Sequence, residues 1–112
     1  MFRIIVVVNI VISFKYHVFV CTCSSCLAKD AENVLFSLRR KIEAEGLINE
    51  VNVSRAGCVF KGQCRKYGPF VVIYPQNVWY QKVTANDIDI IVKQHLKRGQ
   101  IVSRLLFFAP NR

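Results

Sequence analysis

The chain has 112 residues, of which 53% are hydrophobic and 21% are charged, and its formal net charge is +9. This length suits a single domain, and the hydrophobic content excludes intrinsic disorder as the main state. The positive charge favours an acidic partner, such as an acidic protein surface, a nucleic acid or an anionic lipid. No basic run is interleaved with aromatic residues, so we do not expect a nucleic-acid partner.

An apolar run, residues 2–14, opens the chain. It is shorter than the roughly 20 apolar residues that span a membrane, and no A-x-A-like cleavage site follows it. We therefore expect residues 1–15 to form an extension outside a domain of residues 16–112. An extra strand or helix and a membrane-targeting segment are the alternatives, and only the last would bring the protein into contact with a membrane.

The first part of the domain has the pattern of a strand followed by a helix. Residues 16–22, YHVFVCT, are β-branched and aromatic, which predicts a buried strand. The apolar spacing of Leu35, Leu38 and Ile42 predicts a helix over residues 30–45. We expect Asp30 to cap its N-terminus and Gly46 to follow its C-terminus.

The second part has the pattern of three strands and another helix. Apolar and polar residues alternate in residues 49–55, which predicts a half-buried strand. Residues 70–74 are all apolar and predict a buried strand, which a turn connects to a hairpin partner at residues 78–81. A helix is expected over residues 85–97, opened by a capping box of Thr84 and Asp87. His95 lies beside its apolar face and is interpreted as a core histidine, and the apolar tail is expected to pack onto the domain or a partner.

This order predicts an α/β fold. A strand–helix–strand unit makes the first two strands parallel, and the hairpin adds antiparallel strands. The outline is a thioredoxin-like sandwich, with a central mixed sheet flanked by helices. Because parallel neighbours end at the same edge of a sheet, the loops that follow the first two strands are expected to meet there.

These two loops carry all five cysteines, Cys21, Cys23 and Cys26 in one and Cys58 and Cys64 in the other. An odd number at such tight spacing, without a convincing export signal, argues for a reducing cytoplasm rather than a secreted disulfide framework. Four thiolates from two loops suit a 2Fe–2S cluster, and they would also suit zinc, although zinc favours shorter spacings. The C-x-x-C of Cys23 and Cys26 suits a metal-free thiol–disulfide oxidoreductase or thiol sensor.

Three sequence blocks occur in a characteristic order: HVFVCTCSSC, then RAGC and GQC, then GPFVVIYPQNVWYQKVTANDIDIIVKQHLKRG. Followed by VSRLLF, they resemble the thioredoxin-like 2Fe–2S ferredoxin family over residues 16–108. That family includes stand-alone ferredoxins and the 2Fe–2S subunits of complex I and of NAD-linked hydrogenases.

The resemblance implies a 2Fe–2S cluster bound by four cysteines, Cys21, Cys26, Cys58 and Cys64. The first pair has the C-x4-C spacing of the complex I branch. The second pair is two residues further apart than the usual C-x3-C, and Gly62 would ease the resulting bulge. Cys23 has no usual counterpart and is interpreted as the spare thiol.

The implied function is one-electron transfer rather than catalysis by the protein itself. The chain would exchange electrons with a redox partner protein, which the basic surface predicts to be acidic, either alone or as a component of a larger oxidoreductase. A homodimer is a further expectation, because members of the family often dimerise. The expected location is the cytoplasm.

Overall fold

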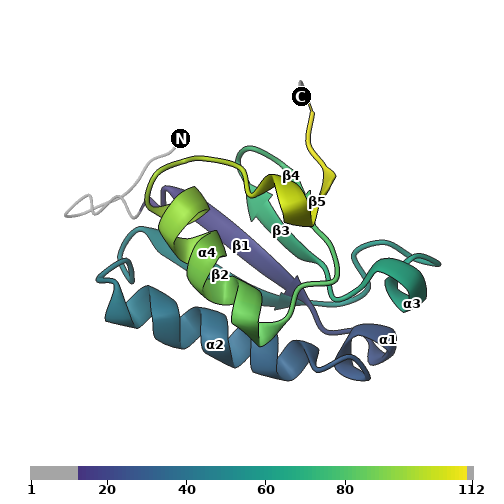
Figure 1. The fold of residues 1–112 in the computed structure, drawn as a ribbon. Coiled ribbons are helices and arrows are strands. Elements are labelled where there is room, and N and C mark those ends of the chain that lie inside the picture. Colours follow the sequence, from purple (N-terminus) through teal and green to yellow (C-terminus); the bar gives the residue numbers. More distant parts are fainter. Residues whose placement is uncertain (1–12, 111–112) are drawn as a thin grey trace, which may run out of the picture.

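One five-stranded sheet organises the protein in a computed structural model that describes residues 13–110. Its strands are β1 (Tyr16–Cys21), β2 (Val51–Ala56), β3 (Val71–Tyr74), β4 (Val78–Tyr80) and β5 (Leu106–Phe108). In space their order is β2-β1-β3-β4-β5 (Figure 1). β1 and β2 run parallel, and every other neighbouring pair is antiparallel. The predicted mixed sheet and the parallel first pair are confirmed.

The fifth strand was not predicted. The tail forms a 3-10 turn, η3 (Ser103–Leu105), and then β5, which pairs with β4 across a register shift at Trp79 and Tyr80. β5 has only three residues, and Arg104 interrupts the apolar tail just before it. So short a run shows too little alternation of apolar and polar residues to predict a strand. The expected packing of the tail onto the domain is confirmed, in the form of an edge strand.

The first long helix, α2 (Ala31–Ala44), matches the predicted helix closely. Gly46 follows it with a φ of 73°, the left-handed conformation that glycine adopts without strain. Asp30 occupies the position before the helix, but its side chain makes no capping hydrogen bond to the backbone. Its carboxylate instead accepts a hydrogen bond of 3.3 Å from the Asn33 side chain, so the predicted cap is wrong in mechanism.

The second predicted helix is continuous but changes its winding. A 3-10 turn, η1 (Ala85–Asp87), leads into α4 (Ile88–Ile90) and then into a π-helical segment, η2 (Ile91–Leu96). The capping box is confirmed, because the Asp87 carboxylate accepts hydrogen bonds of 2.8 and 3.1 Å from the backbone N–H and the hydroxyl of Thr84. Within residues 13–110, no helix is both long and apolar enough to cross a membrane.

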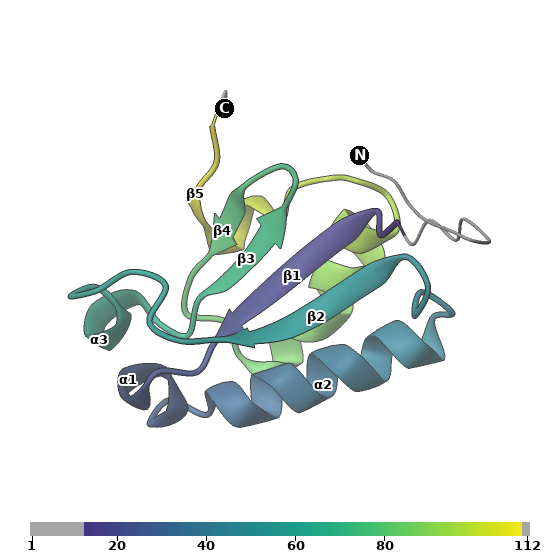
Figure 2. The same ribbon diagram turned by 180° about the vertical axis from the view of Figure 1, so that it is seen from behind.

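The core lies between one face of the sheet and the two long helical segments. Val18 and Val20 from β1 pack with Leu35 and Leu38 from α2, and Ile91 from η2 joins them. Each such side chain stabilises the fold by roughly 1.5–3 kcal/mol through burial. α2 and α4 therefore cover the same face: α4 passes in front of β1 in Figure 1 and behind the sheet in Figure 2, and α2 runs below the sheet in both views.

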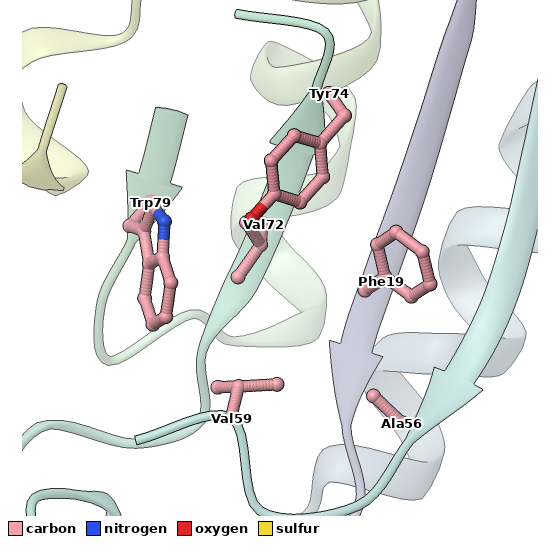
Figure 3. A pocket seen from close by; sticks show the side chains of 6 residues that line it. All are labelled: Phe19, Ala56, Val59, Val72, Tyr74 and Trp79. Atoms are coloured by element: carbon pink, nitrogen blue, oxygen red, sulfur yellow. The ribbon is translucent and has the colours of Figure 1, made fainter. Parts of the chain in front are cut away.

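The opposite face of the sheet carries no helix among residues 13–110, as Figure 2 shows. It bears a shallow apolar hollow of about 280 Å³, lined by side chains from four strands and the loop after β2 (Figure 3): Phe19, Ala56, Val59, Val72, Tyr74 and Trp79. We call this surface the open face. The strand pairing places Phe19 opposite Val72 and Val72 opposite Trp79, so all three side chains project from the same side.

Most of the predicted extension, residues 1–15, lies outside the described residues. At its described end, Phe14 is exposed, and the backbone N–H of Lys15 donates a hydrogen bond of 2.8 Å to the carbonyl of Glu50. β1 begins directly after it, at Tyr16.

Candidate metal centre

The two cysteine loops meet at one end of the sheet. β1 ends at Cys21 and β2 ends at Ala56, and these two residues are partners in the parallel ladder. Each loop contains a short helix, α1 (Ser24–Leu27) and α3 (Cys64–Tyr67), and the two helices are in contact (Figures 1 and 2). The predicted meeting of the loops is confirmed, whereas these one-turn helices are too short for a periodicity to predict.

Four cysteine sulfurs form a single group. The Sγ atoms of Cys21, Cys23, Cys26 and Cys64 all lie within 4.8 Å of one another. The Sγ of Cys21 lies 3.6 Å from that of Cys23 and 3.7 Å from that of Cys64. Cys21, Cys26 and Cys64 are buried and Cys23 is half-buried. These distances exceed the roughly 2.05 Å of a disulfide bond, and the described cysteines are all free thiols.

Cys58 lies at the edge of this group. It is exposed, and its Sγ lies 3.6 Å from the Sγ of Cys64. The structure thus groups three of the predicted ligands with Cys23, the thiol interpreted as spare, and brings the fourth predicted ligand to the rim. The C-x-x-C spacing of Cys23 and Cys26 was the sequence signal for this, because residues three apart face each other across one helical turn.

The polypeptide backbone contacts the sulfurs from several sides. The thiols of Cys21 and Cys64 donate to the carbonyls of Gly57 and Phe60, at 3.2 and 3.7 Å. The backbone of Cys26 lowers the pKa of the Cys23 thiol, and the backbone of Phe70 lowers that of the Cys26 thiol, as a nearby N–H does for a thiolate. Amide donors of this kind stabilise thiolates and tune a bound metal group.

The thiols differ in acidity. Burial on its own would raise the pKa of Cys23. The backbone of Cys26 and the neighbouring thiols together lower it by more, so the pKa of Cys23 is about 7. Burial, helped by the neighbouring Cys21, raises the pKa of Cys26 to about 12. Burial likewise raises the pKa of Cys64. A metal group that binds these sulfurs must therefore displace protons from at least two of them at neutral pH.

A close-packed wall lies behind the sulfurs. Phe70 and Ala31 are fully buried against Cys26 and Cys21. Gly68 fits against the site so tightly that a Cβ there would lie 2.7 Å from the Cys26 Sγ and 2.6 Å from the Cys64 carbonyl oxygen. Neither Gly68 nor Ala31 was predicted as a site residue, although Gly68 begins the third of the three sequence blocks that carry the resemblance.

Positive charge surrounds the cysteine end. The Lys29 ammonium donates to the carbonyl oxygen of Arg65 and lies 3.4 Å from that of Cys64. Arg65 and Lys66 are exposed on α3, and Lys61 is exposed in the loop before it. Such charges favour an anionic group bound at the cysteines.

The donor set fits an iron–sulfur group. Iron–sulfur clusters take four cysteine thiolates, and this site offers five cysteines, four of them with mutually close sulfurs. The buried apolar wall on one side and amide donors on another are the surroundings that tune such a group. Four thiolates also satisfy zinc, so the arrangement of donors on its own leaves both groups open.

Comparison with known proteins decides the family. No protein-family model matches the sequence. A curated 2Fe–2S ferredoxin of Clostridium pasteurianum is 36% identical over 99 residues, which cover 81% of this chain and 94% of the relative. The chain belongs to the 2Fe–2S ferredoxin family. A second relative, the 2Fe–2S ferredoxin of Aquifex aeolicus, is 35% identical over 99 residues, 80% of this chain and 86% of that protein.

The fold of this ferredoxin is also shared with solved members of the family. A structure of a thioredoxin-like [2Fe-2S] ferredoxin from Aquifex aeolicus superposes with a TM-score of 0.78 at 32% identity. The match covers 89% of this chain and 96% of the solved chain. The thioredoxin-like α/β fold predicted from the sequence is therefore confirmed.

Proposed function

We propose that this ferredoxin is a one-electron carrier that holds a 2Fe–2S cluster between its two cysteine loops. The observation that carries the proposal is the group of four cysteine sulfurs within 4.8 Å of one another, at the end of a thioredoxin-like fold that solved [2Fe-2S] ferredoxins share. Bound there, a 2Fe–2S cluster takes up and gives off one electron. The protein supplies the thiolates, the buried wall and the amide donors.

The ligands we propose are Cys21 and Cys26 from the first loop and Cys58 and Cys64 from the second. Two observations support this set. Cys21, Cys26 and Cys64 are buried together, and Cys58 Sγ lies within 3.6 Å of Cys64 Sγ. The two-residue expansion between Cys58 and Cys64 is accommodated by a loop in which Gly62 has a φ of 88°.

Purification without oxygen tests the proposal. The protein should be red-brown, with visible absorption from sulfur-to-iron charge transfer and about two irons and two sulfides per chain. A reductive titration should take up one electron per chain. Colourless protein with one zinc per chain would overturn the assignment, and the same measurement separates the two groups that the thiols can hold.

A metal-free thiol activity is the second candidate. The thiol of Cys23 is half-buried with a pKa of about 7, and the buried Cys26 sulfur lies within 4.8 Å of it. A reactive thiolate next to a buried resolving thiol is the arrangement of dithiol oxidoreductases. Metal-free protein that reduces insulin disulfides, with the activity lost in Cys23→Ser, would favour this candidate.

We infer that the redox partner docks an acidic surface against the cysteine end. The exposed Lys61, Arg65 and Lys66 support this inference, together with Lys29 beside them. Reduced protein should react with an anionic oxidant, hexacyanoferrate, faster than the difference in reduction potential alone predicts. Added salt should slow that reaction. With a cationic cobalt oxidant, salt should not slow the reaction. Equal salt dependence for both oxidants would contradict the inference.

The setting of this electron transfer follows from the same features. The ferredoxin relatives indicate an electron carrier rather than a catalytic enzyme. We propose that the protein works in a reducing cytoplasm, where five thiols at one site remain unpaired. It serves there as a free carrier or as a component of a larger oxidoreductase, and co-purification of the tagged protein from its own cells at low salt distinguishes the two.

We also propose a homodimer through the open face. Phe19, Tyr74 and Trp79 present apolar surface there, and the side chains on the neighbouring positions of β2, Asn52 and Ser54, carry no charge. In a chain with a net charge of +9, an apolar surface without charge is where a second copy meets the least repulsion. A two-fold pair would bring the same patch of both copies together.

Sedimentation equilibrium tests the dimer. Tyr74→Lys puts a charge on the open face and should convert dimer into monomer. The matched control is Phe36→Lys, because Phe36 is at least as exposed as Tyr74 but lies on α2, on the other side of the sheet. A monomeric wild-type protein, or a dimer that only the control variant disrupts, would contradict the proposal.

A further inference from the structure

The site contains one thiol more than a 2Fe–2S cluster takes. Cys21, Cys26 and Cys64 are buried, whereas Cys23 and Cys58 occupy the rim. Both rim cysteines line the same surface hollow, of about 430 Å³, together with Cys64, Gly62 and Arg65. The two rim thiols therefore face the same space, with the sulfur of Cys64 within 4.8 Å of Cys23 and 3.6 Å from Cys58.

The two rim cysteines are held differently. Cys23 stands directly before α1, and its carbonyl accepts a hydrogen bond of 2.8 Å from the backbone N–H of Leu27, which fixes the turn. Cys58 follows Gly57 in a loop that is loosely packed, because a Cβ added at Gly57 or at Gly62 would meet no atom within 4 Å. Cys23 thus has a fixed position close to three sulfurs, and Cys58 has room to approach or to withdraw.

We infer that Cys23 is an exchangeable ligand that replaces Cys58 as the fourth thiolate of the cluster. The inference rests on the proposed function and names a fifth residue of the same site. The exchange would conserve charge and donor type, because Cys23 would lose a proton on binding and Cys58 would take one up on leaving. The ligand set would therefore still be four cysteine thiolates.

Three alanine variants test the exchange: Cys58→Ala, Cys23→Ala and the double variant. Alanine removes the sulfur without offering an oxygen ligand, and both positions are outside the fully buried core, so far-UV circular dichroism should stay unchanged. Each single variant should retain about two irons per chain and an all-thiolate visible spectrum. The double variant keeps only three thiols and should lose the cluster.

Alkylation with iodoacetamide before and after removal of the cluster gives an independent readout. Native wild-type protein should take up one label per chain, and native Cys58→Ala should take up none, because its four remaining thiols are all ligands. Cluster loss in Cys58→Ala alone would overturn the exchange and leave the proposed function intact. So would a double variant with the same iron content as the single variants. A wild-type protein without iron would overturn the proposed function and this inference together.

Discussion

Gly68 offers the sharpest test of how the fold shapes the site. It lies between α3 and β3, with a φ of −67°, a conformation that alanine adopts without strain. A methyl group there would nevertheless lie 2.7 Å from the Cys26 Sγ and 2.6 Å from the carbonyl oxygen of Cys64. Gly68→Ala therefore perturbs the site by volume alone, at two residues that we propose to bind the cluster.

The expected cost can be worked out from those contacts. Carbon atoms at optimal contact lie about 3.5–4.0 Å apart, so both neighbours must move by roughly 1 Å or the methyl group must be displaced. One neighbour is backbone and the other is a fully buried sulfur, so neither can rotate away. Overpacking of this kind costs about 1–3 kcal/mol. We expect the free energy of unfolding of Gly68→Ala to fall by that amount.

Urea unfolding and the rate of cluster loss measure the effect. The matched control is Gly57→Ala, because Gly57 lies in the other half of the same site and a Cβ there meets nothing within 4 Å. Gly68→Ala should be less stable than wild type and should lose iron faster to a chelator, whereas Gly57→Ala should match wild type in both. Equal stability and equal iron retention in the two variants would refute the reasoning.

Three further predictions concern charge and capping. Burial lowers the pKa of His95 from 6.5 to about 4, so the unfolded chain takes up a proton first as the pH falls. The protonation of His95 should therefore decrease the free energy of unfolding by roughly 3 kcal/mol between pH 6.5 and 4. Urea unfolding measures this decrease, and the His95→Gln variant should not show it. Asp87→Ala removes the capping box and should cost about 1–2 kcal/mol in the same assay; an unchanged midpoint would contradict this. Replacement of Lys61, Arg65 and Lys66 by Gln should lower the midpoint potential by a few tens of millivolts at low salt, and an unchanged or higher potential would count against it.

His95 illustrates what an amphipathic pattern can predict. Its place beside the apolar face of the last helix predicted a core histidine, and it is 1% exposed with its Nδ1 hydrogen-bonded at 2.6 Å to the hydroxyl of Tyr80. That hydroxyl also accepts a hydrogen bond of 2.9 Å from the backbone N–H of Val102. The burial followed from local spacing, whereas both partners come from other elements and could not be predicted from it.

The open face shows the opposite case. The sequence predicted strands and two helices, and the strand–helix–strand order predicted parallel pairing of β1 and β2. The second helix covers the same side of the sheet as α2 only if the chain turns to that side after β4, and the sequence pattern does not specify this turn. The structure places both on one side and leaves Phe19 and Trp79 on the other, half-buried around a hollow.

The sequence by itself determined the strands β1 to β4, the two long helical segments and the end of the sheet at which the cysteines meet. The elements follow from local patterns, namely β-branched runs, an apolar helical stripe and a capping box. Each pattern involves residues close together in the chain, so it can be recognised without knowledge of tertiary contacts. Only the tertiary structure decided which sulfurs lie together. The sulfur of Cys23 lies with the three buried sulfurs and Cys58 is exposed beside them, because a sulfur's position depends on how each loop turns after its strand. That turn is set by packing between residues about thirty-five positions apart, which local spacing does not encode.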